Sequence, residues 1–416
     1  MKKITPDVER VRRDILRMSE FVSSEEPGYT RISFSKEDRE AREFVAHLMK
    51  EEANLSVRID AAGNLIGSRR GESQKPAILV GSHIDTVRGG GRFDGVSGVI
   101  AAIEIVRRFE EEKTPMIHPL EVIVFLAEEP SPFGISTVGS RAMTGKLSED
   151  LLTSLKDGQG RTLGGAIEWM GGKPSRIGEA KRSPAEVLAF LELHIEQGPI
   201  LYSRGIPIGA VTGIVGISRG RIEVVGRMDH AGTIPMEARK DALVAGSEVV
   251  LALEKVCREL EGVVGTIGKV EVFPNSLNVI PSRVNLGMEV RSLSEALLHE
   301  TESLFRKELD RVVQKRGVEI HFDSAISSKP VLFHPRLVEQ VARVCGSLGI
   351  SYLEMPSGAG HDANHLAEVA PTGMIFVPSK DGRSHCPEEW TEFEQVCLGA
   401  EILAHTVISL DKEAVN

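Results

Sequence analysis

Three ionisable side chains stand among glycines directly after the apolar residues 78–80. The loop that follows, GSHIDTVRGGGRFDG, carries His83, Asp85 and Asp94. In open α/β sheets, ligands gather beyond the carboxyl ends of strands. Imidazole and carboxylate groups are ligands that zinc and manganese accept. The loop therefore favours a metal-binding or catalytic site over a plain turn.

Similar residue types follow other apolar segments. Glu128 and Glu129 come after EVIVFLA, His194 lies in ELHIEQG, and His385 lies in GRSHCP. Two imidazoles with one carboxylate suit one cation, and one imidazole with two carboxylates suits a second. Asp94 has two oxygens and could bridge both. Paired divalent ions polarise a carbonyl and activate water, so this set predicts metal-assisted hydrolysis.

Each of these residues also has an ordinary interpretation. A single histidine after a strand is often a hydrogen-bonded core or surface residue, and the glutamate pair alone would fit a solvated loop. The glycine run could be a flexible turn. Spacing alone leaves the metal site and these ordinary roles both open.

The bulk composition limits the function classes. The chain has 416 residues, with 41% hydrophobic and 26% charged residues, which predicts a globular protein of two domains. A net charge of −10 argues against a nucleic-acid surface and a polybasic membrane patch. We expect no signal peptide and no stretch long enough to span a bilayer. Four cysteines without a CxxC pair fit a reducing cytoplasm without disulfides.

The first part of the chain alternates strands with helices. This order predicts a largely parallel sheet covered on both faces. The expected helices are 6–24, 36–52 and 96–109. The expected strands are two within 55–69, then 77–80, 121–127 and, late in the chain, 374–377.

The pattern changes near position 212. Strands near 221–227, 264–273, 283–291 and 318–324 and helices near 238–260 and 294–316 follow in a β-α-β-β-α-β order. This is the ferredoxin-like arrangement. The predicted fold class is thus α/β with two domains: a main domain of residues 1–211 and 327–416, and an inserted α+β domain of residues 212–326.

Several longer motifs add a family resemblance. GSHIDTVRGGGRFDG, FLAEE, ELHIEQGPIL, DHAGTIPMEARKDAL, SLNVIP, PSGAGHDA and GRSHCPEEWT closely resemble the M20-type amidohydrolases of the hydantoinase/carbamoylase family. They run in the family's order from about position 30 to 390. The resemblance implies a di-metal catalytic domain and an inserted lid domain that also forms a homodimer interface.

The resemblance also implies roles for the metal-site residues. It implies five ligands for two divalent ions: His83, Asp94, Glu129, His194 and His385. Asp94 is the bridging ligand, Glu128 the general base, and Asp85 the acid that orients His83, which fixes the tautomer of that ligand. Zinc or manganese is the implied metal, and cobalt and nickel are also compatible.

Further residues are implied to contact substrate. His230 matches a histidine that stabilises the oxyanion, from the same or the partner subunit. Asn278 and Arg291 match residues that hold the substrate carboxylate, and Gln197 and His361 match further contacts. An arginine fork suits bidentate carboxylate binding. Without the resemblance, Arg291 would equally fit a surface ion pair, and Asn278 a turn residue.

One segment departs from the family pattern. Relatives continue the glutamate pair with glycine and an Arg-Phe pair, whereas this chain has Pro130-Ser131-Pro132-Phe133. The two prolines stiffen the loop directly after a predicted metal ligand. The departure concerns the choice of substrate more than the metal chemistry.

The implied reaction is hydrolysis of the ureido C–N bond of a small carboxylate-bearing substrate. An N-carbamoyl-L-amino acid is the preferred substrate, giving amino acid, CO₂ and ammonia. The alternatives are an allantoate amidohydrolase, a β-ureidopropionase or a ureidoglycolate amidohydrolase and, further away, an M20 peptidase or aminoacylase. A binding scaffold with decayed catalysis is disfavoured, because Glu128 and all five ligands are present.

Overall fold

The computed structural model describes residues 4–72 and 76–413 and divides into two compact units. Unit 1 comprises Met1–Thr212 with Phe333–Asn416, and unit 2 comprises Gly213–Leu332. The sequence places the divisions after 211 and 326. The second observed division thus comes later, after the short strand β13 (Val331–Leu332).

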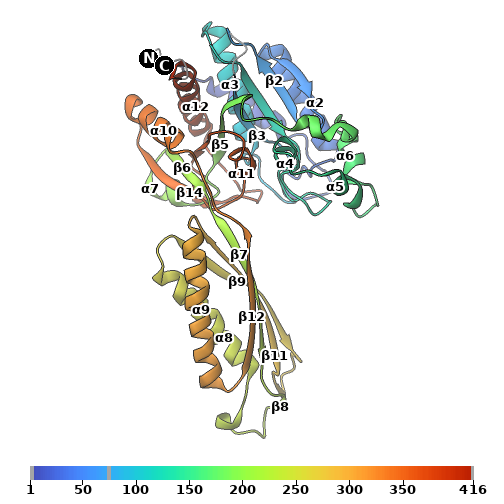
Figure 1. Cartoon of the computed structure of the whole chain (residues 1–416), viewed down its shortest axis with the longest axis vertical. Coiled ribbons are helices and arrows are strands. Elements are labelled where there is room, and N and C mark those ends of the chain that lie inside the picture. Colours follow the sequence, from blue (N-terminus) through green and yellow to red (C-terminus); the bar gives the residue numbers. More distant parts are fainter. Residues whose placement is uncertain (1–3, 73–75, 414–416) are drawn as a thin grey trace. The chain divides into compact units, whose positions relative to one another are not determined.

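A nine-stranded sheet is the centre of unit 1 (Figure 1). Its order is β1-β2-β4-β3-β5-β15-β6-β13, with β14 beside β6. The strands are β1 Ser56–Ile59, β2 Leu65–Arg69, β3 Ala77–His83, β4 Leu120–Phe125, β5 Val187–Ile195, β6 Ile208–Ile214, β14 Tyr352–Ser357 and β15 Thr372–Val377. The four central strands β4, β3, β5 and β15 are parallel. The pairs towards both edges are antiparallel.

Helices cover both faces of this sheet. They are α1 Val8–Met18, α2 Lys36–His47 with a π-helical turn over Leu48–Glu52, α3 Val96–Glu111, α4 Val138–Met143, α5 Glu149–Ser154, α6 Leu163–Trp169, α7 Ile200–Arg204, α10 Pro335–Leu348, α11 Ala363–Leu366 and α12 Phe393–Glu413. Short 3₁₀ turns span Pro174–Ala180 and Lys380–Gly382.

Strand β5 shows how the two faces differ. Leu191 and Leu193 join the apolar core beneath α3 and α12. Glu192 points to the opposite face, where its carboxylate accepts the N–H of Ala363 in α11. Since successive side chains of a strand alternate between faces, His194 lies on the same face as Glu192. The α/β architecture predicted from the sequence is confirmed, with the parallel arrangement confined to the centre of the sheet.

Two predicted helices are too long at one end. Helix α1 ends at Met18 rather than 24, because the buried Arg31 guanidinium donates to the carbonyls of Met18 and Phe21. Helix α8 begins at Ala242 rather than 238, because Asp241 caps it and accepts two N–H groups of its first turn. At the start of α2, Ser35 accepts the N–H of Asp38, as the capping motif predicts.

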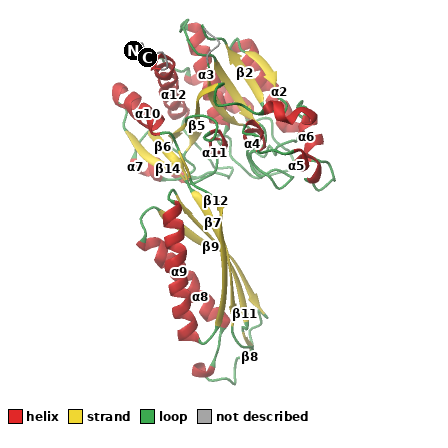
Figure 2. Ribbon diagram, viewed as in Figure 1, coloured by secondary structure: helices red, strands yellow, loops and turns green. Residues whose placement is uncertain are grey.

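Unit 2 is a four-stranded antiparallel sheet with two helices (Figure 2). Its elements are β7 Gly216–Val225, β8 Asp229–His230, a 3₁₀ turn Met236–Ala238, α8 Ala242–Glu259, β9 Val263–Phe273, β10 Val279–Ile280, β11 Arg283–Ser292, α9 Glu295–Arg316 and β12 Glu319–Ser328. The main sheet order is β12-β7-β11-β9, and β8 pairs with β10. Helices α8 and α9 pack on one face around an apolar core. This chain order and sheet order are those of a ferredoxin-like unit.

One helix of the described chain has the length and composition of a membrane span. It is the segment Phe393–Lys412 of α12, with a mean hydropathy of 1.2, and 78% of it is buried inside the structure. The expectation that no stretch is long enough was therefore wrong. The apolar character of α12 serves the core of unit 1, where it packs on α3, α1 and α10.

Candidate metal centre and active site

Three neighbouring parallel strands bring the predicted ligands to one edge of the sheet. His83 is the last residue of β3, His194 is near the end of β5, and Glu128 and Glu129 follow β4. The chain turns between β4 and the glutamates at Ala127, whose φ is +52°. Because parallel neighbours end at the same edge, residues far apart in the sequence become neighbours in space.

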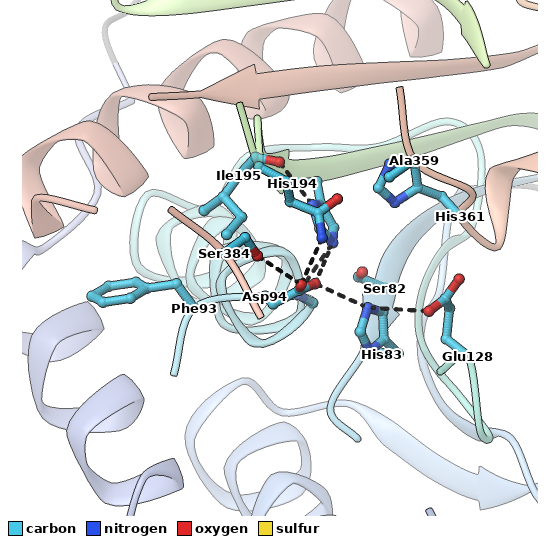
Figure 3. A network of polar contacts seen from close by, with 12 residues as sticks. Ser82, His83, Phe93, Asp94, Glu128, His194, Ile195, Ala359, His361 and Ser384 are labelled. Atoms are coloured by element: carbon cyan, nitrogen blue, oxygen red, sulfur yellow. Dashed lines mark hydrogen bonds and ion pairs between the residues drawn. The ribbon is translucent and has the colours of Figure 1, made fainter. Parts of the chain in front are cut away.

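Asp94 lies at the middle of the cluster, and its two oxygens face different partners. Oδ1 lies 3.0 Å from Nε2 of His194 and 3.5 Å from Nε2 of His83. Oδ2 lies 3.1 Å from Nε2 of His385. Figure 3 shows His83 and His194 turned towards this carboxylate, with Ser384 approaching it from another side. Asp94 thus joins two groups of side chains.

Backbone carbonyls fix the tautomers of the two buried imidazoles. Nδ1 of His83 lies 3.0 Å from the carbonyl oxygen of Asp85, and Nδ1 of His194 lies 2.9 Å from that of Ile195. Since a carbonyl only accepts, each Nδ1 carries the hydrogen in the neutral ring, and Nε2 keeps its lone pair for the site. Gly95 leaves room for His83: its φ is +64°, and a Cβ there would lie 2.5 Å from the imidazole.

The carboxylate of Asp85 holds the glutamate pair. Its two oxygens accept the backbone N–H groups of Glu128 and Glu129, at 3.2 Å and 3.1 Å. Its Oδ1 lies 3.6 Å from Nδ1 of His83, farther than the Asp85 carbonyl oxygen does. Asp85 therefore contacts His83 mainly through its main chain and positions Glu128 and Glu129 through its side chain.

Burial and neighbouring charges perturb the acids of the cluster. Burial raises the pKa of Glu128 well above its usual range; His83 opposes this effect, and the Glu129 carboxylate reinforces it. Glu128 Oε2 lies 3.8 Å from Nε2 of His83. Burial would also raise the pKa of Asp94, but the nearby histidines, His194 first, hold it well below the usual value. One carboxyl group thus favours taking up a proton while its neighbour stays ionised.

His385 completes the second group from a separate loop. Its Nε2 lies 3.4 Å from Oε1 of Glu129 as well as beside Asp94, and these two carboxylates raise the pKa of His385 to about 10. The residue has a φ of +56°, and its side chain is 48% exposed. The partly open His385 marks the side from which a small molecule can reach the cluster.

The donor set fits two divalent cations. Within the described chain, His83, Asp94 and His194 form one group with converging ligand atoms, and Asp94, Glu129 and His385 form a second. Nitrogen and carboxylate donors without thiolate suit zinc or manganese. Beside the cluster, Oε1 of Gln197 is buried without a hydrogen-bond partner, while Nε2 donates to Asp94 Oδ2 at 2.7 Å. Such an unsatisfied oxygen is expected next to a ligand-binding position.

A third converging group, Glu192, His194 and His361, has less free coordinating capacity. Both Glu192 oxygens already accept hydrogen bonds, from Ser82 and from Ala363. Nε2 of His361 lies 2.9 Å from the hydroxyl of Ser357. Burial lowers the pKa of His361 well below its usual value, so this ring stays neutral beside the cluster. The structure thus places His361 and Gln197 next to the predicted ligands.

The loop that departs from the family pattern is closed on itself. The N–H of Ser131 donates to the carbonyl of Ile135 at 3.1 Å, and Gly134 donates back to Ser131 at 3.0 Å. Phe133 is only 5% exposed and packs edge-on against Phe34, with ring centroids 5.3 Å apart. In this loop Phe133 is therefore a core side chain of unit 1.

The remaining predicted contacts belong to unit 2. His230 is exposed on β8, and its Nδ1 accepts the N–H of Gly232 at 3.0 Å. Asn278 is exposed, and its Oδ1 accepts the hydroxyl hydrogen of Ser276. Arg291, on β11, pairs with Glu289 at 2.6 Å. These three residues are described within unit 2 alone.

The sequence analysis missed several buried polar residues behind the cluster. Glu389, which is 1% exposed, accepts the N–H groups of Phe93 and Asp94. Ser384 donates to the same glutamate. Glu192, which is fully buried, binds Ser82 next to His83. Only the repetition of acidic residues near predicted ligands, as in CPEEW and ELHIE, signals their presence in the sequence.

With this geometry described, comparison with known proteins is informative. The sequence pattern of peptidase family M20/M25/M40 matches residues 79–409. The chain belongs to this family. Its match spans both groups of converging ligands and the whole of unit 2.

Individual relatives of this M20-family chain carry amidohydrolase names. An N-carbamoyl-L-amino-acid amidohydrolase of Paenarthrobacter aurescens is 40% identical over 406 residues, 97% of this chain and 98% of the relative. An allantoate amidohydrolase of Bacillus subtilis is 33% identical over 395 residues, 94% and 95% of the two chains. A solved amidase of the hydantoinase/carbamoylase family from Burkholderia multivorans has a TM-score of 0.90 at 33% identity, covering 98% of each chain.

Proposed function

We propose that this chain is a metal-dependent amidohydrolase that cleaves the ureido C–N bond of an N-carbamoyl-L-amino acid. The observation that carries the proposal is the position of Asp94, whose two oxygens face separate imidazole groups beside Glu128. The names of the similar proteins supply the substrate class. An allantoate amidohydrolase is the second candidate, favoured by the Bacillus subtilis relative.

In this proposal the five predicted ligands hold two divalent ions. His83 and His194 supply nitrogen to one, Glu129 and His385 supply the other, and Asp94 contributes one oxygen to each. Such ions supply Lewis-acid chemistry to a carbonyl and lower the pKa of water. Zinc and manganese both suit the donors, and cobalt and nickel remain compatible.

Glu128 acts as the general base. It is held by its own backbone N–H on Asp85, and burial raises its pKa well above the usual range. A carboxylate of raised pKa accepts the proton of the attacking water and then donates it to the leaving nitrogen. General acid–base catalysis of this kind contributes about 10²–10⁴-fold.

His230 supplies a hydrogen-bond donor to the developing oxyanion. Because the N–H of Gly232 donates to Nδ1, the neutral ring carries its hydrogen on Nε2, which is then free to donate. An exposed imidazole with this tautomer fits the oxyanion role, from the same or the partner subunit.

Arg291 and Asn278 hold the substrate carboxylate. The guanidinium of Arg291 already binds a carboxylate, that of Glu289, through Nε at 2.8 Å and a second nitrogen at 2.6 Å. This two-point contact supports bidentate carboxylate recognition by the same fork. Unit 2 then serves as a lid that brings these groups to the substrate.

Unit 2 also forms the homodimer interface in this proposal. Strand β9 is an edge of the sheet, and Val264 and Val270 on it are 65% and 53% exposed. The preceding helix α8 exposes Val244 and Leu251. Long apolar edge strands tend to pair with another chain. Light scattering of purified wild-type protein and of Leu251→Glu should give a dimer and a monomer, respectively.

The substrate is tested by an ammonia-release screen of metal-loaded protein. The substrates are several N-carbamoyl-L-amino acids, allantoate, N-carbamoyl-β-alanine and ureidoglycolate, with a dipeptide as the peptidase control. The proposal expects the highest kcat/KM for an N-carbamoyl-L-amino acid. Preference for allantoate would select the second candidate, and dipeptide cleavage would select a peptidase. The free cysteines support a reducing, cytoplasmic location for this activity.

A further inference from the structure

Two loops distant in the sequence meet at one buried carboxylate. Oε1 of Glu389 accepts the backbone N–H groups of Phe93 and Asp94, at 2.8 Å and 3.1 Å. Oε2 accepts the hydroxyl hydrogen of Ser384 at 2.7 Å. Glu389 thus binds the residue that precedes His385 and the residue that lies between the two ligand groups.

The local structure is built around this contact. A Cβ at Gly91 would lie 2.1 Å from Oε1 of Glu389, so the loop passes the carboxylate where only glycine fits. The next residue, Trp390, packs edge-on against Phe93, with ring centroids 5.3 Å apart. The main-chain N–H of Glu389 bonds the carbonyl of Cys386, which fixes the turn after His385.

Ser384 adds a constraint through its single hydroxyl hydrogen. Its oxygen lies 2.7 Å from Glu389 Oε2 and 3.2 Å from Asp94 Oδ2, and it can donate to only one of them at a time. The shorter contact assigns the hydrogen to Glu389. The lone pairs of Asp94 Oδ2 then stay available on the side where His385 and Gln197 approach.

We infer that Glu389 is a positioning residue: by holding Asp94 and Ser384 together, it sets the distance between the bridging carboxylate and His385 and so the geometry of the second cation site. The inference rests on the proposed function, because that site is part of it. Groups that orient metal ligands typically change metal affinity or activity by about 10–100-fold when removed.

The test compares Glu389→Ala and Glu389→Gln with a matched control. Glu388→Ala removes the neighbouring glutamate, which is 60% exposed and pairs with Arg383. Purified full-length proteins are loaded with Co²⁺ alone. Metal content, the visible spectrum, chelator competition, thermal unfolding and kcat and KM are then measured.

For Glu389→Ala we expect weaker binding of one of two Co²⁺ ions by about 10–100-fold, a changed spectrum and a lower kcat at nearly unchanged KM. Glu389→Gln retains an oxygen for the two N–H groups and should recover much of the binding. Glu388→Ala should match wild type. A folded Glu389→Ala protein with wild-type Co²⁺ affinity, spectrum and kcat would overturn the inference.

Two further results separate this inference from the proposed function. Wild-type protein that binds two Co²⁺ ions but releases no ammonia from any ureido substrate would contradict the proposed function, while the Co²⁺ data would still decide the role of Glu389. If Glu389→Ala does not fold, Ser384→Ala tests the same link. It should shift the Co²⁺ spectrum in the same direction by a smaller amount, and an unchanged spectrum would overturn the inference.

Discussion

The two units treat charged residues in opposite ways. In unit 1, the acids and imidazoles of the cluster are buried at strand ends, with His83, Asp94 and His194 at most 4% exposed. In unit 2, the strands alternate buried apolar residues with outward polar ones, and the ion pairs lie on the outer face, as in Arg219–Glu289. The residues proposed to meet substrate from unit 2 are exposed or already paired. Unit 1 is therefore organised to hold cations, and unit 2 to offer groups that can exchange partners.

The largest expected effect is on the residue that joins the two ligand groups. Asp94→Ala should lose both cations and reduce hydrolysis by more than the about 10²–10⁴-fold expected for loss of a general base. The reason is that each Asp94 oxygen faces a different imidazole group. Elemental analysis and ammonia release check this, with Asp157→Ala, an acid of a loop turn, as control. Full activity of Asp94→Ala would remove the proposed metal chemistry.

Glu128→Gln should separate binding from chemistry in the same cluster. Glutamine keeps the size and the backbone contact with Asp85, since that contact uses the main-chain N–H. We expect both cations and the thermal unfolding midpoint to be retained, while kcat falls by about 10²–10⁴-fold. Substantial turnover by this variant would show that another group is the base.

The sequence predicted the cluster because its signal is local. His83, Glu128 and Glu129 follow apolar strands, so residue type and position together indicated a site at strand ends. Strand β5 was not assigned, although it carries His194, since Glu192 and His194 interrupt its apolar run. Glu389 had no local signal, because its partner loop lies 296 residues earlier. Long-range contacts of this kind become visible only once the fold brings the loops together.

A buried ion pair of unit 1 should matter to stability rather than to catalysis. Asp14 and Arg107 are each about 1% exposed in their side chains and lie 2.6 Å apart, linking α1 to α3. Asp14→Ala leaves a buried guanidinium with less compensation, which should lower the free energy of unfolding by about 3 kcal/mol. Denaturant unfolding measures this. A loss below that of an exposed pair would contradict the contrast between the units.

Arg291→Ala tests whether unit 2 supplies the carboxylate contact. Loss of a charge-assisted contact of about 1.5–3 kcal/mol should raise KM by roughly 10–100-fold with a smaller effect on kcat. Arg219→Ala is the matched control, because Arg219 pairs with the same Glu289 and is 63% exposed. Equal KM values for wild type and Arg291→Ala would place the substrate carboxylate elsewhere.

The smallest effect is expected for an exposed ion pair of unit 2. The carboxylate of Glu248 lies 2.7 Å from Lys315 and also contacts Arg316, and these cations lower its pKa from 4.5 to about 2. Its folded pKa is below the unfolded one, so the pair contributes stability above pH 4.5 and loses it as the pH falls towards 2. Because the side chains are partly exposed, Glu248→Gln should cost at most about 1 kcal/mol at pH 7. The difference between wild type and variant in urea unfolding should shrink from pH 5 to pH 3. A larger cost, or one independent of pH, would mean that unit 2 depends on its surface charges as unit 1 depends on its buried ones.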